Sequence, residues 1–384
     1  MTWLDRRAVA ESAFIKEKTG VTIDPSFYLP KILWLKEHNP AVYKETAYFF
    51  SPAEFIGFYL TGEAYMIFPG EGLENFFWTS ELAAALKIEK EKLPPFAAIG
   101  DPVGKICKTA LQALPFREGT PLFGGGPDFA MSLLGTGTVV PGRGCDRAGT
   151  SEGINICSEQ QVKDSRLMSY RHVIADYWNV TGIISTTGKA AEWYKNEFLP
   201  ESTFDRFYAE AAQAEKGAGK LLFLPYLAGE RAPLWDTHVR GTFLGLSLHH
   251  GQREMIRAVL ESSGYAIRDV LEVMEENGVW TDELRIAGSA SKIDLLNQIK
   301  ADITGKPIAV PEITGSEITG GLCTALYGMG RFSSLKEASD ILVRITKVFE
   351  PSRDRARYND LFVLYREAYR RLKQFYLELD TLGD

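Results

Sequence analysis

The first clear structural signal in the sequence is the segment Leu122-Phe123-Gly124-Gly125-Gly126-Pro127-Asp128-Phe129. A short apolar run enters three glycines, and residues 129–134 have helical character, so the stretch predicts a strand, a turn and a helix. The same order recurs later. Residues 284–286 are strand-like, Gly288-Ser289-Ala290-Ser291 forms a tight loop, and apolar residues then follow at helical spacing up to Gly305. Because this order places ligands at strand ends, we predict an α/β protein with its sites in such loops.

The composition is that of a folded protein. With 384 residues, of which 45% are hydrophobic, the chain is long enough for about two domains. Its formal net charge of -7 argues against a nucleic-acid partner, and no apolar run is long enough to span a bilayer. The four cysteines are scattered, with no histidine at metal-binding spacing. We therefore expect a cytoplasmic protein with reduced thiols, no membrane partner and no metal-ligating residues.

The segment Pro141-Gly142-Arg143-Gly144 is rich in proline and glycine, which indicates a loop between the first strand–helix unit and a β-rich segment. We expect one domain at residues 1–142, a second at residues 143–384, and a cleft where the two lobes meet. Apolar stripes predict core helices at residues 255–274 and 358–379. The second stripe is aromatic and could stack bases, but such a stripe is more often the buried face of a helix.

Asp128 opens the helix of the first unit. Aspartate is among the best helix N-caps, so position alone does not separate capping from catalysis. Glycines on both sides, at residues 124–126 and in Gly135-Thr136-Gly137, let a ligand approach the backbone closely. A carboxylate placed there can accept the proton of an attacking hydroxyl group, which favours a role in phosphoryl transfer.

Gly149-Thr150-Ser151 offers backbone N–H groups and two hydroxyls that can hold anionic oxygens. An ordinary polar hairpin turn is the first alternative. The second is a nucleophile elbow, because residues 149–153 fit Gly-x-Ser-x-Gly and would make Ser151 the nucleophile of a serine hydrolase. An elbow needs a helix after its serine, whereas residues 154–157 continue as an alternating strand, which disfavours a hydrolase. No segment has the spacing of a Walker A loop.

Taken in order along the chain, the motifs resemble those of the FGGY family of carbohydrate kinases. The matching segments cover nearly the whole chain: Trp3-Leu4-Asp5-Arg6-Arg7-Ala8, Lys31-Ile32-Leu33-Trp34-Leu35 with Pro40, residues 55–63, Gly126-Pro127-Asp128 with Gly135-Thr136-Gly137, Gly149-Thr150-Ser151, residues 229–233, 241–246, 257–261 and 298–302. The resemblance implies a two-lobed actin/hexokinase-like (ribonuclease H-like) fold. It also implies transfer of the γ-phosphoryl group of ATP, with Mg²⁺, to a hydroxyl of a sugar, ketose or sugar acid. Xylulose-like and gluconate-like acceptors are the leading candidates.

Carried over residue by residue, the resemblance assigns roles to particular positions. Asp128 would be the catalytic base, and Thr150, within Gly149-Thr150-Ser151, would bind ATP phosphate. Gly188 matches a nucleotide-contacting glycine. Gly288 and Ser289 begin the loop that lies against adenosine.

Three residues depart from the family pattern, each standing where glycine is frequent: Pro127, Thr187 and Ser289. Pro127 stiffens the turn before Asp128 without having to move its carboxylate. A Cβ at Ser289 is expected to narrow the nucleotide site, unless φ is negative at this residue and the nucleotide contacts only its backbone.

The resemblance also places an Asp-x-Gly-Thr phosphate loop ahead of Trp3. We therefore expect the first strands of the N-terminal domain to be missing, so that the chain alone binds ATP weakly and phosphorylates no sugar. An N-terminal kinase fragment acting in trans is one candidate partner, and a homodimer is another. A non-catalytic sugar or nucleotide sensor, which lost activity with that loop, is the alternative function.

Overall fold

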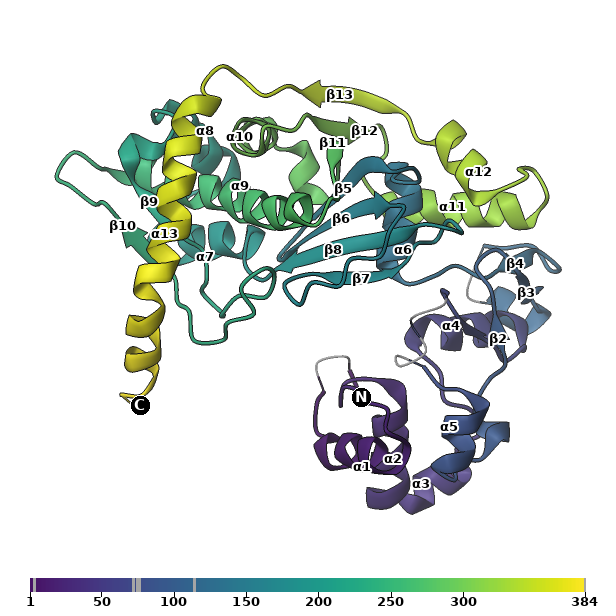
Figure 1. Ribbon diagram of the computed structural model, residues 1–384. Helices are drawn as coiled ribbons and strands as arrows, with labels where there is room; N and C mark the ends of the chain where they lie inside the picture. The colour runs from purple at the N-terminus through teal and green to yellow at the C-terminus, as the bar shows by residue number, and fades with distance from the viewer. Residues whose placement is uncertain (3–4, 71–72, 74–76, 113–114, 383–384) are drawn as a thin grey trace. The chain divides into compact units, whose positions relative to one another are not determined.

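The computed structural model describes residues 1–2, 5–70, 73, 77–112 and 115–382 (Figure 1). The chain forms two compact units. The first is Met1–Ala130 with Gly321–Leu335, and the second is Met131–Gly320 with Lys336–Asp384. The domain boundary expected at residue 142 stays a prediction, and the Trp3-Leu4 start of the first motif lies outside the described residues.

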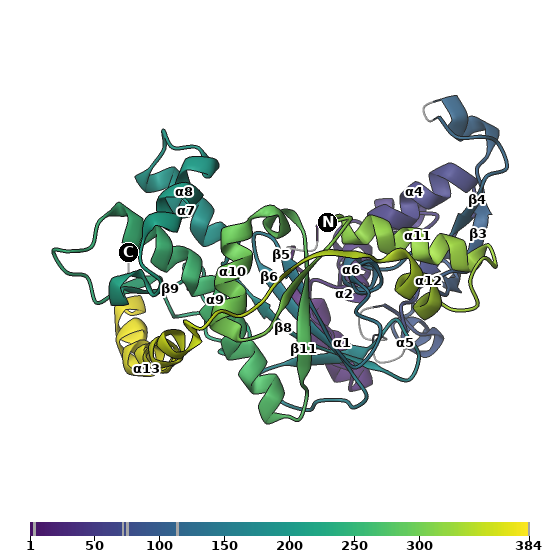
Figure 2. The same cartoon turned by 90° about the horizontal axis from the view of Figure 1, so that it is seen from above.

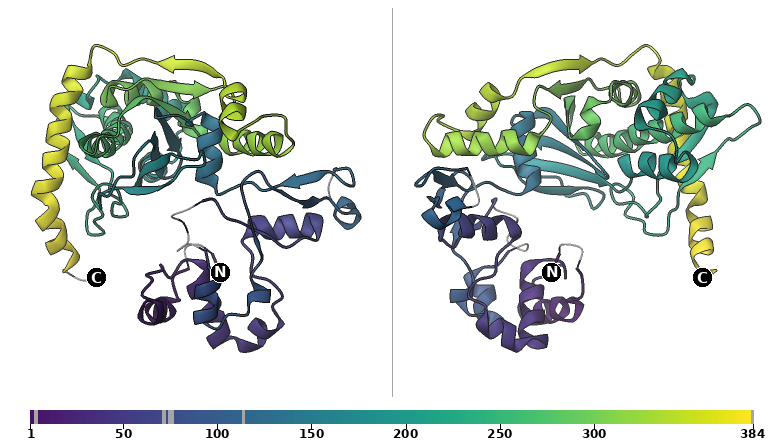
Figure 3. Two further views of the ribbon diagram at one scale, coloured as in Figure 1. Left: turned by 45° about the vertical axis from the view of Figure 1, so that its right-hand side comes forward. Right: turned by 180° about the vertical axis from the view of Figure 1, so that it is seen from behind.

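The first unit is mainly helical. Its helices are α1 (Val9–Thr19), α2 (Tyr28–His38), α3 (Pro40–Glu45), α4 (Pro52–Thr61) and α5 (Ser80–Ala85), with 3₁₀ turns at Lys90–Lys92 and Lys108–Gln112. Two small sheets complete it: β1 (Met66–Ile67) is parallel to β2 (Phe96–Ala97), and β3 (Pro102–Lys105) is antiparallel to β4 (Pro121–Phe123). Ile15 of α1 and Leu29 and Ile32 of α2 are buried in one hydrophobic cluster. The two helices lie next to each other near the N-terminus of the chain (Figure 3).

A seven-stranded sheet forms the centre of the second unit, with the order β13-β12-β11-β5-β6-β8-β7. Its strands are β5 (Gly142–Ala148), β6 (Glu152–Ser158), β7 (Met168–Arg171), β8 (Trp178–Ile184), β11 (Thr281–Ala287), β12 (Ile308–Pro311) and β13 (Ile345–Phe349). Strands β5 and β11 are parallel and in register up to Arg147 and Ala287. The loops that follow these two strands therefore leave the sheet at the same edge.

Helices cover this sheet and extend the unit. They are α7 (Gly188–Phe198), α8 (Phe204–Gln213), α9 (Gln252–Glu276), α10 (Asp294–Thr304), α12 (Leu335–Leu342) and α13 (Arg355–Asp380), with a two-stranded sheet of β9 (Leu222–Leu224) and β10 (Thr242–Leu244). Three helices contribute residues to both units: α6 (Asp128–Thr136), α11 (Ser316–Gly328) and α12, whose first residue, Leu335, belongs to the first unit. Helix α9 packs against α10 and against strands β6 and β8, and most of its residues from Ile256 to Met274 are buried, which confirms the core helix predicted at residues 255–274 (Figure 2).

The aromatic stripe of α13 is only partly a core face. Tyr358, Phe362 and Tyr365 are buried, as the stripe predicts. The prediction is wrong for Phe375 and Leu379, which are 56% and 46% exposed. The physical reason is the direction of these two side chains, since other residues on the same turns contact the protein: Tyr376 is 2% exposed, and Asp380 pairs with His238 and Arg240. In the described part of the chain, no helix is both long and apolar enough to cross a membrane.

Candidate functional site

The Gly149-Thr150-Ser151 segment closes the hairpin between β5 and β6. Ala148 pairs with Glu152 across the hairpin, and the Gly149 N–H donates a hydrogen bond to the Ser151 carbonyl at 3.1 Å. Gly149 and Thr150 are exposed. Strand β6 begins directly after Ser151, whereas a nucleophile elbow requires a helix there. The hairpin context therefore does not favour a serine hydrolase.

Helix α7 begins against this turn. A Cβ on Gly188, its first residue, would lie 2.2 Å from the Gly149 carbonyl oxygen, so only glycine permits the approach. The Lys189 N–H then donates to the Thr150 carbonyl at 3.0 Å. The Ala190 and Ala191 N–H groups donate to the Thr187 carbonyl, so the helix start acts on an anion chiefly through its partial positive charge. The contact thus places a site suited to anions beside the Thr150 hydroxyl.

The loop after β11 approaches the same hairpin. Gly288 has φ +88°, and a Cβ there would lie 2.3 Å from the Ala148 carbonyl oxygen. Ser289 follows as the first residue of a 3₁₀ turn, Ser289–Lys292, and is not among the residues with positive φ. The Cβ of Ser289 therefore causes no backbone strain. Thr187 is similar, with φ -109° and ψ -76°.

These three loops border a cavity of about 460 Å³. It is lined by Ala148, Gly149, Thr150, Glu152, Thr187, Gly188, Ala191, Glu192, Asn196, Phe204, Tyr208, Val259, Leu260, Ser263, Ser289, Ala290, Ile293 and Leu296. Of the six residues assigned to nucleotide binding by resemblance, Gly149, Thr150, Gly188 and Ser289 line the cavity. Ser151 and Gly288 lie in the loops that border it.

The cavity has the size and composition of a small-molecule site. Such sites typically measure about 300–1,000 Å³ and combine apolar walls with a few polar groups. Here α9 and α10 supply Val259, Leu260 and Leu296, and the aromatic rings of Phe204 and Tyr208 come from α8. Sequence reasoning missed this apolar wall, because its parts come from helices far apart in the chain.

Thr187 contributes a polar group that the sequence indicated only as a departure from the family pattern. Its side chain is 5% exposed, and its hydroxyl has no hydrogen-bond partner among the described residues. A buried hydroxyl without a partner costs free energy, which a ligand oxygen would recover. Thr187 directly precedes the N-terminus of α7, so this hydroxyl and the helix start together fit a phosphate group.

A buried ionic triad lies behind the turn. Lys300 of α10 contacts Asp146 of β5, with Nζ 2.7 Å from Oδ2, and also contacts the Glu152 carboxylate of β6. All three side chains are at most 2% exposed. Desolvation, reinforced by the neighbouring Asp146 carboxylate, raises the pKa of Glu152 to about 8. The sequence carried one signal of this triad, a lysine within the helix predicted to end at Gly305.

Asp128 is the first residue of α6, and its Oδ1 accepts a hydrogen bond from the Phe129 N–H at 2.7 Å. The side chain is exposed. Asp128 belongs to the first compact unit, whereas every residue that lines the cavity belongs to the second. The catalytic role of Asp128 therefore stays a prediction.

Comparison with known families identifies the class of the protein. Residues 2–135 match the N-terminal domain of the FGGY family of carbohydrate kinases, and residues 147–329 match the C-terminal domain of the same family. Xylulose kinase from Bacillus subtilis (strain 168) is 27% identical over 388 residues, which cover 97% of this chain and 78% of that protein. The chain therefore belongs to the FGGY family of carbohydrate kinases.

Solved structures give the same result. The ligand-bound xylulose kinase from Lactobacillus acidophilus has a TM-score of 0.83 and 27% identity, over 99% of this chain and 81% of that one. Gluconate kinase from the same organism has a TM-score of 0.83 and 28% identity, over 99% of this chain and 80% of that one. The expected two-lobed actin/hexokinase-like fold is confirmed. The protein is an ATP-dependent kinase of sugars or sugar acids, and neither the hydrolase nor the non-catalytic sensor is favoured.

Proposed function

We propose that the cavity between the β5–β6 turn, α7 and the η5 turn at Ser289–Lys292 binds ATP, and that a xylulose-like ketose receives the γ-phosphoryl group. The close approach of Gly188 to the Gly149 carbonyl carries the first part of this proposal. It brings a helix N-terminus, an exposed threonine hydroxyl and a buried threonine hydroxyl to one cavity. This is a donor set suited to phosphate oxygens.

Each group has a separate task at this site. The Thr150 hydroxyl and the N-terminus of α7 hold phosphate oxygens, and the Thr187 hydroxyl donates a further hydrogen bond. The apolar walls from α9 and α10 exclude water from the base and ribose. Phosphoryl transfer depends chiefly on positioning and charge stabilisation, and these contacts supply both for ATP, the phosphoryl donor.

We assign Asp128 to the activation of the sugar hydroxyl that accepts the phosphoryl group. Its carboxylate would accept the proton of the attacking sugar hydroxyl. This carboxylate lies exposed at the first residue of α6, where it can serve as a general base.

Mg²⁺ would accompany ATP. The described residues around the cavity include no cluster of three metal-ligating groups. Magnesium bound with nucleotides keeps several waters and takes phosphate oxygens as ligands, which suits a site with few carboxylates. When bound, it would neutralise charge on the phosphates.

The acceptor is the part of the proposal that rests on the relatives. Xylulose kinases and gluconate kinases are both similar to this chain in sequence and in solved structure, and we propose the ketose as the first candidate and gluconate as the second. The test is an ADP-release assay with ATP and Mg²⁺ on the purified chain, alone and together with an N-terminal kinase fragment that carries an Asp-x-Gly-Thr loop, using D-xylulose, D-gluconate and glycerol as separate acceptors. Turnover is compared, here and in the kinetic predictions below, in the presence of the fragment. We expect turnover with xylulose above that with gluconate. Equal background rates with all three acceptors would contradict the assignment.

A further inference from the structure

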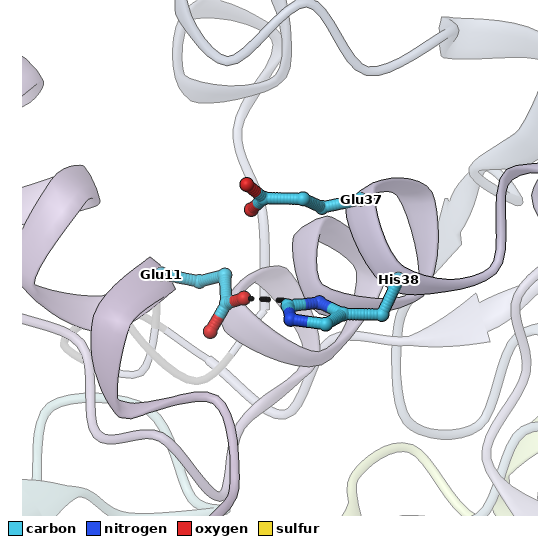
Figure 4. A group of neighbouring side chains, drawn as sticks. All are labelled: Glu11, Glu37 and His38. Atoms are coloured by element: carbon cyan, nitrogen blue, oxygen red, sulfur yellow. Dashed lines mark ion pairs between the residues drawn. The ribbon is translucent and has the colours of Figure 1, made fainter.

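A group of side chains outside the kinase site joins the first two helices. Glu11 lies in the first turn of α1, and Glu37 and His38 end α2 (Figure 4). One carboxylate oxygen or ring nitrogen from each residue lies within 4.8 Å of the other two. None of the three has a role in the proposed kinase mechanism.

Glu11 is the decisive member of this group. Its side chain is 4% exposed, and neither carboxylate oxygen has a hydrogen-bond partner in the part of the chain that the structure describes. A buried carboxylate that receives no hydrogen bond needs a cation to offset its desolvation. Figure 4 shows this carboxylate directed toward the nitrogen-bearing edge of the His38 ring, with the Glu37 carboxylate on the same side.

The His38 ring is held in an orientation typical of a metal ligand. Its Nδ1 lies 3.1 Å from the Trp34 carbonyl oxygen, an acceptor that selects the tautomer protonated at Nδ1. Nε2 then keeps its lone pair. The Trp34 ring also stacks on the imidazole, with centroids 4.7 Å apart and planes 9° from parallel. Metal-ligating histidines commonly donate their other N–H to a backbone carbonyl in this way.

Charge in this region also favours a cation. Glu11 and Glu37 bring two carboxylate groups together, and the C-terminal end of α2 adds partial negative charge. Arg7, the cation that stacks on Trp34, is already paired with Asp5 at 2.9 Å. The ion-pair contact of 3.6 Å joins Glu11 Oε1 to His38 Nδ1, the same nitrogen that faces the Trp34 carbonyl, and a single histidine charge would offset only one of the two carboxylates.

We propose that Glu11, Glu37 and His38 bind a divalent transition-metal ion of the zinc type, which fastens α1 to α2. The mixed set of two carboxylates and one imidazole suits zinc better than magnesium or calcium, which prefer oxygen ligands alone. Zinc ligands at about 2.0–2.2 Å lie roughly 3.4 Å from one another. Glu37 is exposed, so its side chain can rotate toward the ion at little cost.

The test is to dialyse the full chain against EDTA and then titrate it with zinc. Calorimetry measures the binding, and thermal unfolding measures the change in melting temperature. We expect one zinc ion to bind and to raise the melting temperature. Glu37→Gln and His38→Asn should each weaken zinc binding about tenfold or more. Both side chains are exposed, so the loss cannot be attributed to misfolding. Cobalt substitution should give a visible absorption spectrum that His38→Asn removes.

Exposed residues of the same types provide the controls. Glu17→Gln on α1 and His249→Asn in the second unit should bind zinc as the wild type does. Zinc affinity unchanged by Glu37→Gln and His38→Asn would overturn the proposal. So would a wild-type protein that takes up no zinc, a result that would leave Glu11 and His38 as an ion pair only.

Discussion

The carbonyl oxygen of Gly149 occupies space that a side chain on Gly188 would need, because a Cβ built on Gly188 lies 2.2 Å from it. Two loops that are distant in the sequence therefore meet through their backbones. The hydrogen bond from the Lys189 N–H to the Thr150 carbonyl continues this contact into the first turn of α7. The phosphate-binding arrangement that we propose depends on this approach.

Replacing Gly188 tests the approach directly. Gly188→Ala should move the start of α7 away from the β5–β6 turn, since the conflicting atom is backbone and cannot rotate away. We expect the rise in melting temperature produced by saturating ATP to be lost. Gly153→Ala is the matched control, because its Cβ would meet no atom closer than 3.6 Å. A normal ATP-induced rise in Gly188→Ala would contradict the arrangement.

The Thr150 hydroxyl can be tested by two substitutions that differ in one group. Thr150→Val removes the hydroxyl and keeps the shape, whereas Thr150→Ser keeps the hydroxyl. Hydrogen bonds to charged groups contribute roughly 1.5–3 kcal/mol, so Thr150→Val should raise the KM for ATP about tenfold or more. Thr150→Ser should stay within a few-fold of the wild type. Similar KM values for the two variants would exclude the hydroxyl from phosphate binding.

Asp128→Asn separates catalysis from helix capping. Asparagine caps helices about as well as aspartate, so the melting temperature should change little. It cannot accept the hydroxyl proton, and general bases typically contribute about 10²–10⁴-fold to turnover. We expect kcat to fall by that order with little change in the KM for ATP. Glu118→Gln, an exposed change in the same unit, should leave kcat unaltered. Wild-type turnover in Asp128→Asn would remove Asp128 from the mechanism.

The buried triad predicts a specific pH dependence of stability. The pKa of Glu152 is about 8 in the folded protein, against 4.5 as its ordinary value. Between these values the folded state holds a proton that the unfolded state has released, so stability falls as pH rises. Glu152→Gln removes this dependence. Its stability relative to the wild type should therefore increase from pH 5 to pH 8, by an amount on the order of a few kcal/mol.

Unfolding of both proteins across this pH range provides the measurement. The exposed Glu159→Gln should follow the wild type at every pH. If the difference in free energy of unfolding between Glu152→Gln and the wild type were the same from pH 5 to pH 8, Glu152 would be ionised over that whole range. Lys300→Met should be destabilising by about 3–5 kcal/mol, because it leaves the buried Asp146 carboxylate without its cation.

Local patterns in the sequence predicted the elements that position the site. The strand, glycine loop and helix after residue 284 are confirmed as β11, the Gly288 loop and α10, which ends at Thr304 before Gly305. Each of these signals lies within a few residues, where glycine conformation and hydrophobic spacing decide the structure.

Features made by distant residues were not predictable in the same way. The Lys300 triad joins two strands to a helix more than a hundred residues later, and Phe204 and Tyr208 reach the cavity from α8. Glu11 was likewise not distinguishable from an ordinary exposed glutamate in the first turn of a helix. Burial of such groups depends on how the elements pack, which hydrophobic spacing alone does not determine.

The location of a bound nucleotide tests the central claim most directly. Crystals of the protein grown with a non-hydrolysable ATP analogue and Mg²⁺ would show where the analogue binds. We predict that its phosphates lie against Thr150 and the N-terminus of α7, and that its base lies among the apolar residues of the cavity, such as Leu296. An analogue bound elsewhere, with this cavity filled only by water, would contradict the account.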